Sequence, residues 1–326
     1  MTELLFFLDM IVFTVIGGYI LTSVILFKYP HLLHRRKQLK FSCRHISHRG
    51  GAAESLENTI ASFQRAVDLG TDLLEMDVQL SKDGKVVVSH DNDLWRCTGV
   101  NSSISELNYD ELPPLKPSLS VDFCNGLVCP ASDDRRIPLL KDVFAKFPST
   151  PMNIDVKADK DELIQKVNKL ILEFNREDIT IWGSFHNKVA EKCYETNPKI
   201  PMFFSARSVV YLMILTYTGL LPFMKIKHSC LEVLLPSVAY KNPMIRQTSF
   251  LMRHTVLLKM IEWFLVRKFL LDYLWKRGIP TYLWVINDKE DYQRAFDLGA
   301  AGIMTDRPTL LREFLEENPH VGRVNQ

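Results

Sequence analysis

The sequence has few cysteines and almost no net charge. Six cysteines are spread over 326 residues, and none forms a C-x-x-C pair or a disulfide framework spacing. Disulfide-dense chains are small and secreted, so we expect free thiols in a reducing compartment. The formal net charge is only +2. This balance argues against a strongly electrostatic partner such as duplex DNA, and we expect no nucleic-acid partner.

Positive charge is absent from the start of the chain. Residues 1–27 contain no lysine or arginine, and residues 10–27 contain no charged residue at all. This run approaches the ~20 residues that cross a bilayer. No basic segment precedes it and no small-x-small cleavage site follows it, so an uncleaved membrane anchor over residues 1–28 is favoured over a signal peptide.

A basic segment follows the apolar run. Residues 29–44 are predicted to be a juxtamembrane linker without an acidic residue, and the cations in and beside it are Lys28, Arg35, Arg36, Lys37, Lys40 and Arg44. Positive charge beside a span marks its cytosolic side, so we expect an integral membrane protein with a cytosolic globular part, on the endoplasmic reticulum or another internal membrane. The same cations suit anionic headgroups, which makes membrane lipid an expected partner.

The most informative stretch of the chain begins at His45. A short apolar run stops at residues 48–51, His-Arg-Gly-Gly, where the glycines permit the left-handed backbone of a tight loop. An apolar pattern of helical period then ends at Gly70, and a strand is predicted over residues 73–81. The segment therefore reads strand, loop, helix, strand.

The strand over residues 73–81 has two carboxylates on one face. Glu75 and Asp77 are two positions apart, so their side chains point the same way. Like charges at that distance resist joint ionisation unless a cation lies between them, which indicates a metal site. Asp83-Gly84 then predicts a hairpin. A two-residue turn places His90 opposite Asp77 on the same face, whereas a loop one residue longer would shift this register.

These motifs together resemble a known family. HRG at 48–50, LENT at 56–59, E-x-D at 75–77, D-G at 83–84 and His-Asp at 90–91 follow one another as in the glycerophosphodiester phosphodiesterase family. The resemblance covers residues 45–317. Within the family the chain looks most like the small membrane-anchored members that act as lysophospholipase D, because of its apolar N-terminus and the local sequence HISHRGG.

The remainder of the chain alternates between strands and helices. Further strands are predicted at residues 152–157, 179–183, 202–205, 281–287 and 302–306, and helical patterns separate them. So many repeats in one core predict an α/β fold, a (β/α)8 TIM barrel over residues 45–317 behind an N-terminal transmembrane helix, with a tail at 318–326. Active residues are expected at the carboxyl ends of the strands.

Two apolar segments interrupt this pattern. Residues 209–224 contain no charge, but a span there would put strands of one barrel on opposite sides of a bilayer. Residues 207–230 are therefore predicted to be a membrane-facing insertion, which dips into one leaflet or packs beside the active-site mouth. Residues 252–276 fit either an ordinary barrel helix or an interfacial helix that touches lipid.

The acidic residues predict a divalent metal site. Glu75, Asp77 and Asp155 are the expected ligands of one hard cation, Mg²⁺ or Ca²⁺, because such ions prefer oxygen. His90 is an alternative ligand, as its predicted place opposite Asp77 allows. The family commonly has glutamate where Asp155 stands, so this shorter side chain would reach the ion through water or shift the position of the ion.

The chemistry of a phosphodiester sets the roles of the other residues. Hydrolysis needs neutralised phosphate charge, a deprotonated nucleophile and a protonated leaving group. His48 and His90 are the expected base and acid, in an order that the sequence leaves open. Arg49 and Lys157 are expected to neutralise the phosphate. The resemblance supports these roles and implies that a substrate hydroxyl attacks first, giving a cyclic phosphate that water opens.

Three further residues are candidates for substrate binding, each with a purely structural alternative. Glu57 can also be a first-turn helix acid, and Asn58 can be a helix cap. Trp284 can stack on substrate or simply pack. Asp306, which precedes Arg307 and a proline, is interpreted as the cap of the last helix.

The anchor, the basic linker and the apolar insertion would be superfluous for a water-soluble substrate and suit one with a single acyl chain. The predicted function is a metal-dependent lysophospholipase D, which cleaves lysophosphatidylcholine or a glycerophospho-N-acylethanolamine to lysophosphatidate, or its relative, and the head alcohol. A glycerophosphodiesterase for deacylated substrates and a catalytically inactive membrane scaffold are the alternatives. The intact motif residues oppose an inactive protein; they are His48, Arg49, Glu75, Asp77 and His90.

Overall fold

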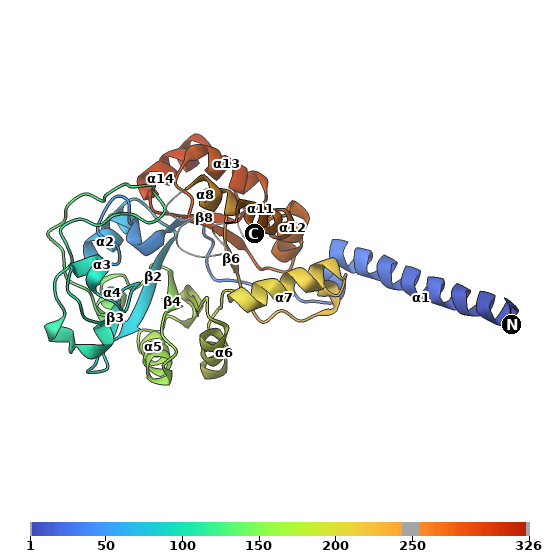
Figure 1. Cartoon of the computed structure of the whole chain (residues 1–326), viewed down its shortest axis with the longest axis horizontal. Coiled ribbons are helices and arrows are strands. Elements are labelled where there is room, and N and C mark those ends of the chain that lie inside the picture. Colours follow the sequence, from blue (N-terminus) through green and yellow to red (C-terminus); the bar gives the residue numbers. More distant parts are fainter. Residues whose placement is uncertain (1, 243–253, 324–326) are drawn as a thin grey trace.

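The first element of the protein is a long helix that extends away from a rounded body (Figure 1). The structure, a computed structural model, describes residues 2–242 and 254–323. Helix α1 (Thr2–Lys28) contains one stretch, Leu5–Lys28, with a mean hydropathy of 2.3, and only 6% of its most apolar window is buried. This stretch is long and apolar enough to cross a membrane, as the sequence predicts.

Seven parallel strands form most of a closed ring. Their hydrogen-bonded order is β5-β4-β2-β1-β8-β7-β6. Residues 202–203 fill the remaining gap, because Met202 bridges Trp182 and Phe203 bridges Cys230, both in parallel. The predicted (β/α)8 barrel is confirmed, and the seven strands are β1 (His45–Ser47), β2 (Leu73–Leu80), β4 (Met152–Val156), β5 (Thr180–Gly183), β6 (Leu231–Leu234), β7 (Thr281–Trp284) and β8 (Gly302–Thr305).

Helices surround this ring. Local capping explains where some of them begin: Thr59 Oγ1 accepts from the Ser62 amide at 3.1 Å, and Asp288 Oδ1 accepts from the Asp291 amide at 2.9 Å. The outer helices are α2 (Ile60–Asp68), α4 (Leu140–Lys146), α5 (Asp161–Glu173), α6 (Asn187–Thr196), α7 (Ala206–Tyr217), α12 (Lys268–Lys276), α13 (Lys289–Asp297) and α14 (Pro308–Glu317). Shorter or additional helices are α3 (Trp95–Thr98), α8 (Pro236–Lys241), α11 (Thr255–Leu265), η1 (Pro30–Leu32), η2 (His48–Gly50), η3 (Ile104–Glu106), η4 (Tyr109–Glu111), η5 (Glu177–Ile179) and η6 (Leu221–Phe223).

The apolar core is divided between the two halves of the ring. One cluster joins β2, β3 (Val86–Val88) and β4 to α4, α5 and α6. The other joins β6 and β7 to α7, α11, α12, α13 and α14. Because each helix buries an apolar face against the strands, the strand ends remain available for polar side chains.

The basic segment after α1 is bound along the base of the barrel. Lys37 donates its amide to the Arg277 carbonyl at 2.9 Å and its Nζ to the Lys227 carbonyl at 2.6 Å. Gly278 has a φ of +72°, and a Cβ there would lie 1.9 Å from the Lys37 carbonyl oxygen. Burial lowers the pKa of Lys37 to about 8. The predicted linker is therefore attached to the loops that precede β6 and β7.

The predicted register of the hairpin is wrong by one residue. Strand β3 pairs with β2 so that Val78 faces Val88, and the loop therefore contains one residue more than a two-residue turn. Ser81 Oγ donates to Asp83 Oδ1 at 2.6 Å, and this contact stabilises the longer loop. The Ser89 amide donates to the Asp77 carbonyl, so Ser89 and not His90 lies opposite Asp77.

Two apolar segments of the sequence form shorter helices than their apolar lengths suggest. Residues 209–224 are divided between α7 and η6, and α7 contains only 12 residues, about 18 Å, which is too short to span a bilayer. Residues 254–276 form two helices, α11 and α12, while residues 252–253 lie outside the described part of the chain. Strand β6 has no counterpart among the predicted strands.

Strand β6 brings an unexpected acid into the interior. Glu232 Oε2 accepts from Asn153 Nδ2 at 2.9 Å, and Cys230 Sγ lies 3.4 Å from the other carboxyl oxygen. Burial raises the pKa of Glu232 to about 8, and the negative charges of Glu75 and Asp155 act in the same direction. Glu232 is therefore a neutral acid at neutral pH.

The raised pKa of Glu232 makes stability depend on pH. The folded chain keeps a proton that the unfolded chain loses above about pH 4.5, so wild-type stability falls as pH rises from there to about 8. Glu232→Gln cannot ionise and keeps an acceptor for Asn153. Its melting temperature, relative to wild type, is expected to be higher at pH 8 than at pH 5 by differential scanning fluorimetry. Exposed Glu173→Gln should show no such dependence, and an equal difference at both pH values would contradict the assignment.

Candidate active site

The loop after β1 uses left-handed backbone to turn an amide toward the acidic cluster. Arg49 has a φ of 50°, and Gly50 and Gly51 have φ values of 80° and 97°. A Cβ on Gly50 would lie 2.5 Å from Ser62 Oγ, so only glycine fits there. In this conformation the Arg49 amide donates to Glu75 Oε2 at 2.8 Å. The loop backbone thus holds a carboxylate of the neighbouring strand.

His48 is held by a carboxylate at the end of β8. Its Nδ1 lies 2.7 Å from Asp306 Oδ1, and its Nε2 lies 3.9 Å from Glu75 Oε2. Asn287 supports this pair, because its Nδ2 donates to Asp306 Oδ2 at 3.1 Å. Burial alone would lower the pKa of His48, but the charge of Asp306 outweighs burial and the pKa is raised. A His48 Nδ1–H that donates to Asp306 leaves Nε2 free to exchange a proton.

The three predicted metal ligands lie on two adjacent strands. Asp77 on β2 pairs in register with Asp155 on β4, and Glu75 lies two positions before Asp77. Lys157 Nζ joins the two aspartates, at 2.9 Å from Asp77 Oδ1 and 2.6 Å from Asp155 Oδ2. Asp155 Oδ1 is buried and accepts no hydrogen bond within the described ranges. The structure therefore places Glu75, Asp77 and Asp155 on neighbouring strands, with Lys157 bonded to the two aspartates.

The two acids of β2 have opposite pKa shifts. Burial and the charge of Asp77 raise the pKa of Glu75 to about 7. Burial would also raise the pKa of Asp77, but Lys157 and other cations hold it well below its usual range. Lys157 in turn has a raised pKa, because Asp77 and Asp155 outweigh its own burial. Asp77 is therefore ionised at neutral pH, and Glu75 is poised to gain or lose a proton.

Arg49 and Glu57 connect the loop to a second ionic group. Arg49 Nη1 donates to Glu57 Oε1 at 3.2 Å, and Arg96 Nη2 donates to the same oxygen at 2.7 Å. Both guanidiniums outweigh burial and lower the pKa of Glu57 to about 2. Arg96 Nε also donates to Asp91 Oδ2 at 2.5 Å, and His90 Nδ1 lies 2.7 Å from Asp91 Oδ1. His90 therefore has its own carboxylate partner, as His48 does.

The other two predicted substrate residues have different surroundings. Asn58 has a φ of 57° and donates from Nδ2 to Asp77 Oδ2 at 3.1 Å, so it positions a carboxylate of the cluster. Trp284, at the end of β7, packs edge to face against Phe123 with ring centroids 6.2 Å apart. Phe123 also packs against the ring of His48 at 5.9 Å. Trp284 and Phe123 form an aromatic wall beside His48.

The donor set is of the kind that suits a hard divalent cation. Glu75, Asp77 and Asp155 offer carboxylate oxygens, and Asp155 Oδ1 is a buried acceptor without a donor in the described chain. Across residues 2–242 and 254–323, no three His, Cys, Asp or Glu side chains converge closely enough to hold an ion. Lys157 is the cation that neutralises Asp77 and Asp155, so a bound ion would compete with Lys157 for these oxygens.

Sequence reasoning missed several residues of this site. The interpretation of Asp306 as a helix cap is wrong, because α14 begins after Arg307 without a side-chain cap and the Asp306 carboxylate binds His48. Asp122, from the irregular segment after α3, lies 3.5 Å from Arg49 Nη1. Asn287 and Asp306 stand at predicted strand ends, which is a signal that could have grouped them with His48.

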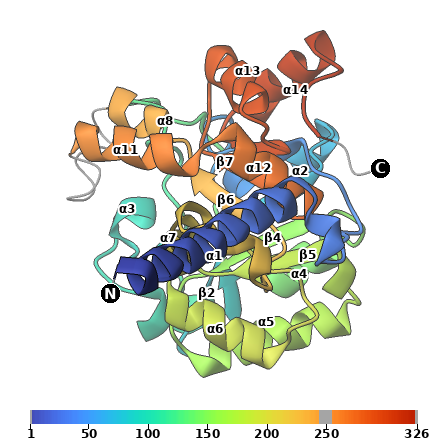
Figure 2. The same ribbon diagram turned by 90° about the vertical axis from the view of Figure 1, so that its right-hand side faces the viewer.

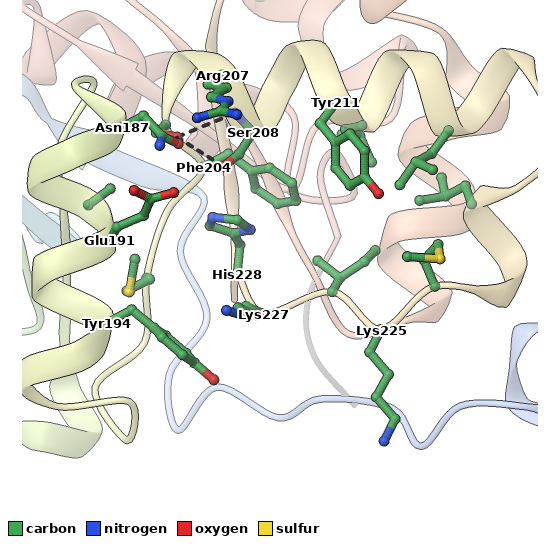
Figure 3. Close-up of a pocket in the computed structure, with 18 of the residues that line it drawn as sticks. Asn187, Glu191, Tyr194, Phe204, Arg207, Ser208, Tyr211, Lys225, Lys227 and His228 are labelled. Atoms are coloured by element: carbon green, nitrogen blue, oxygen red, sulfur yellow. Dashed lines mark hydrogen bonds between the residues drawn. The ribbon is translucent and has the colours of Figure 1, made fainter.

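A separate apolar cavity lies on the outside of the barrel. It has a volume of about 540 Å³ and lies between α6, α7 and the segment that leads to β6 (Figure 3). Figure 3 shows Phe204, Tyr211 and His228 among the side chains that line it. None of the predicted site residues lines this cavity. The acidic cluster and the cavity are therefore distinct features of the molecule.

Comparison with known sequences identifies relatives over nearly the whole chain. The model of the Glycerophosphoryl diester phosphodiesterase family matches residues 48–310. Lysophospholipase D GDPD1 of Homo sapiens is 50% identical over 304 residues, which cover 92% of this chain and 95% of that protein. Lysophospholipase D GDPD3 of Homo sapiens is 36% identical over 310 residues, which cover 95% of this chain and 96% of that protein.

Solved structures share the fold at low sequence identity. A glycerophosphodiester phosphodiesterase from Agrobacterium tumefaciens matches with a TM-score of 0.55 at 19% identity, over 83% of this chain and 99% of that one. An Oleispira antarctica phosphodiesterase in complex with the product sn-glycerol-3-phosphate matches with a TM-score of 0.57 at 18% identity, over 84% and 97%. Identity this low establishes the fold alone.

The charge of Asp306 is expected to set the proton affinity of His48. Asp306→Asn removes the charge that outweighs burial, so the pKa of His48 should fall by about one to three pH units. Nuclear magnetic resonance of isotopically labelled histidine, with His48→Gln to assign the signal, measures this directly. Asp68→Asn, an exposed change on α2, should leave the value unaltered. An unchanged His48 pKa in Asp306→Asn would refute the pairing.

Proposed function

This chain belongs to the glycerophosphoryl diester phosphodiesterase family, and we propose that it is a lysophospholipase D. Two human relatives at 50% and 36% identity, matched over nearly their whole length, are both called lysophospholipase D. The observation that supports hydrolysis most directly is the buried His48–Asp306 pair, whose Nε2 faces Glu75 at 3.9 Å. The proposed substrates are lysophosphatidylcholine, which would yield lysophosphatidate and choline, and glycerophospho-N-acylethanolamines, which would yield glycerol phosphate and the N-acylethanolamine.

The proposed reaction uses the free glycerol hydroxyl of a single-chain substrate. This hydroxyl loses its proton to one histidine and bonds to phosphorus, while the head alcohol leaves with a proton from the other histidine. Water then opens the cyclic phosphate. His48 and His90 suit these steps because each has a carboxylate partner, Asp306 and Asp91 respectively. A second acyl chain would occupy the attacking hydroxyl, so diacyl phospholipids should not react.

Cationic side chains are proposed to neutralise the phosphate. Arg49 and Lys157 are charged at neutral pH, because the neighbouring carboxylates raise the pKa of each above its ordinary value despite burial. Glu57 and Asn58 are proposed to act through their partners: Glu57 orients Arg49, and Asn58 orients Asp77. Trp284 is proposed to contact the glycerol or the start of the acyl chain from the aromatic wall.

Glu75, Asp77 and Asp155 are the proposed ligands of one divalent cation, Mg²⁺ or Ca²⁺. The family typically depends on such a metal. When bound, the ion would add positive charge beside the phosphate and favour an ionised hydroxyl. The burial of Glu75 beside Asp77, which raises the pKa of Glu75, is the observation that favours a cation at this point. His90, which bonds to Asp91 through Nδ1, is the alternative ligand.

Helix α1 is proposed to anchor the catalytic domain on the cytosolic face of an internal membrane such as the endoplasmic reticulum. The support is the 24-residue apolar stretch Leu5–Lys28 and the cations that follow it. Membrane lipid is then a permanent neighbour of the domain, which suits a substrate that resides in the bilayer.

The metal and substrate proposals can be tested in one assay. Purified full-length wild type should cleave lysophosphatidylcholine in Mg²⁺ or Ca²⁺ and lose turnover with chelator, and it should not cleave diacyl phosphatidylcholine. Glu75→Ala should lose turnover with either metal, and His48→Ala should lose about 10²–10⁴-fold in kcat. Product mass identifies the bond that is cleaved.

Exposed Glu173→Ala serves as the matched control and should retain full turnover. Retained turnover in Glu75→Ala would refute the metal assignment. A preference for deacylated substrate would instead favour a soluble-substrate glycerophosphodiesterase.

Glycosylation reports the proposed orientation of the domain. Asn101-Ser102-Ser103 is the only sequon in the chain, and it lies in the barrel domain between α3 and η3. A cytosolic domain should carry no glycan there when the full chain is expressed in mammalian cells, as judged by glycosidase-induced mobility shift. A sequon added before Leu5 should be modified, and a glycan on Asn101 would reverse the proposed topology.

A further inference from the structure

Helix α7 exposes an apolar stripe on the side that faces away from the barrel. Val210, Ile214 and Tyr217 are exposed and follow one another at intervals of four and three residues, so they lie on one helix face. Leu212 and Leu215 are buried against the core on the opposite face. A helix that is largely apolar on both faces is poorly adapted to water, because its outer side offers few polar groups to hydrate.

Helix α11 repeats this arrangement. Val256, Met260 and Trp263 have the same spacing and are 73%, 50% and 57% exposed. Leu258 and Leu265 are buried on the core side. Scattered apolar residues are ordinary on a surface, but two helices with such outer stripes indicate a binding face, even though exposed Lys259 lies beside the stripe of α11.

The two stripes meet. Tyr217 of α7 donates its hydroxyl to the Phe264 carbonyl of α11 at 2.6 Å, and the two rings pack at 5.2 Å. Phe269 of α12 packs against Tyr217 on one side and against Phe27 of α1 on the other. Figure 1 and Figure 2 show α7 and α12 next to the end of α1 that joins the body, with α11 beyond α12. We call this surface the apolar face; its residues are Val210, Ile214, Tyr217, Val256, Met260 and Trp263.

Contacts with α1 indicate how deep in a bilayer the turn after α7 would lie. Tyr19 Oη donates to the Thr218 carbonyl at 2.5 Å, and Ser23 Oγ donates to the Gly219 carbonyl at 2.7 Å. Gly219 permits this approach, because a Cβ there would lie 2.9 Å from Ser23 Oγ. Lys28, the first cation of the chain, follows Tyr19 by nine residues, which is about 13 Å along a helix. If α1 spans the bilayer, this turn lies within the hydrocarbon of one leaflet.

The side chains of the turn match that depth. Leu220 and Phe223 are exposed, and the Phe223 ring stacks on Tyr19 with centroids 6.0 Å apart. Cations lie where the body would meet the headgroups: Lys276 Nζ donates to the Lys28 carbonyl at 3.2 Å, and Arg267 lies 5.1 Å above the Trp263 ring. Apolar side chains below a row of basic ones are typical of interfacial helices.

We propose that the apolar face and the turn after α7 are embedded in the same membrane leaflet as the body-side half of α1. The bilayer lipid is the occupant, since the face is continuous with the helix that is proposed to span the membrane. This inference rests on the anchoring role proposed for α1 and is independent of the catalytic mechanism. It assigns α7 and α11 to the interface and explains why residues 209–224 are apolar without crossing the membrane.

The embedded face adjoins the rim of the candidate active site. Helix α11 packs against α8, which follows the carboxyl end of β6. Catalytic groups of this fold also lie at the carboxyl ends of the strands. The proposed immersion therefore brings the mouth of the barrel close to the lipid that contains the substrate.

Fluorescence quenching in vesicles tests the immersion. A bimane label is attached to Ile214→Cys or Met260→Cys in the full chain, reconstituted in phosphatidylcholine–phosphatidylserine vesicles. Both labels are expected to be quenched several-fold more by doxyl groups on lipid chains than a label on Leu172→Cys, an exposed apolar position of α5. They should also be protected from aqueous iodide. The parent chain, whose cysteines are buried except for the partly exposed Cys124, gives the labelling background.

The controls separate this inference from the anchoring proposal. A label on Ile11→Cys, within α1, should be quenched strongly by lipid. If it is quenched while the labels at 214 and 260 behave like that at 172, the immersion of the apolar face is refuted and the anchor stands. If 214 and 260 are protected from both quenchers, a protein partner covers the face and the proposal is also overturned. An unquenched label at 11 would overturn both.

Discussion

Repulsion between two carboxylates on one strand is the constraint around which the site is built. Glu75 and Asp77 share a face of β2 because a strand repeats every two residues, and both are buried. Lys157 and Arg49 neutralise Asp77, Asn58 donates to it, and the Arg49 amide donates to Glu75. The left-handed loop after β1, the cation after β4 and the neighbouring Asn58 all serve this pair. Without such compensation, burial of two acids so close together would oppose folding.

The parts of this arrangement that depend on local order could be read from the sequence. Three of its signals depend on only a few neighbouring residues each. They are the spacing of Glu75 and Asp77, the glycines after His48 and the alternation of apolar periods. The barrel follows from the alternation, since parallel strands need crossover helices. The barrel in turn brings β1, β2 and β4 side by side, which is why His48 lies beside Glu75 and Lys157 beside Asp77 although they come from three separate segments.

The parts that depend on distant contacts could not be read in this way. Asp306 looked like a cap because its neighbours are Arg307 and a proline, yet it binds a histidine that lies 258 positions earlier. The hairpin loop is longer because the Ser81 side chain bonds to Asp83, and this shifts His90 away from its expected partner. Strand β6 is only four residues long and gave no periodic signal, so Glu232 and its neutral carboxyl were not foreseen. The misses at Asp306 and Glu232 concern interactions that form only after the ring closes, whereas the hairpin register depends on a contact between residues two positions apart.

The attachment of Lys37 to the base of the barrel has a mechanical consequence. A free tether of that length would let the catalytic domain tumble and sample any orientation. Here the Lys37 amide and ammonium bind carbonyls that precede β7 and β6, and the Gly278 backbone lies directly against the Lys37 carbonyl oxygen. The segment thus holds α1 rigidly against the barrel and does not act as a flexible linker. With α1 in a bilayer, as proposed, the domain would diffuse laterally at a fixed orientation and would meet only substrate molecules in the same membrane.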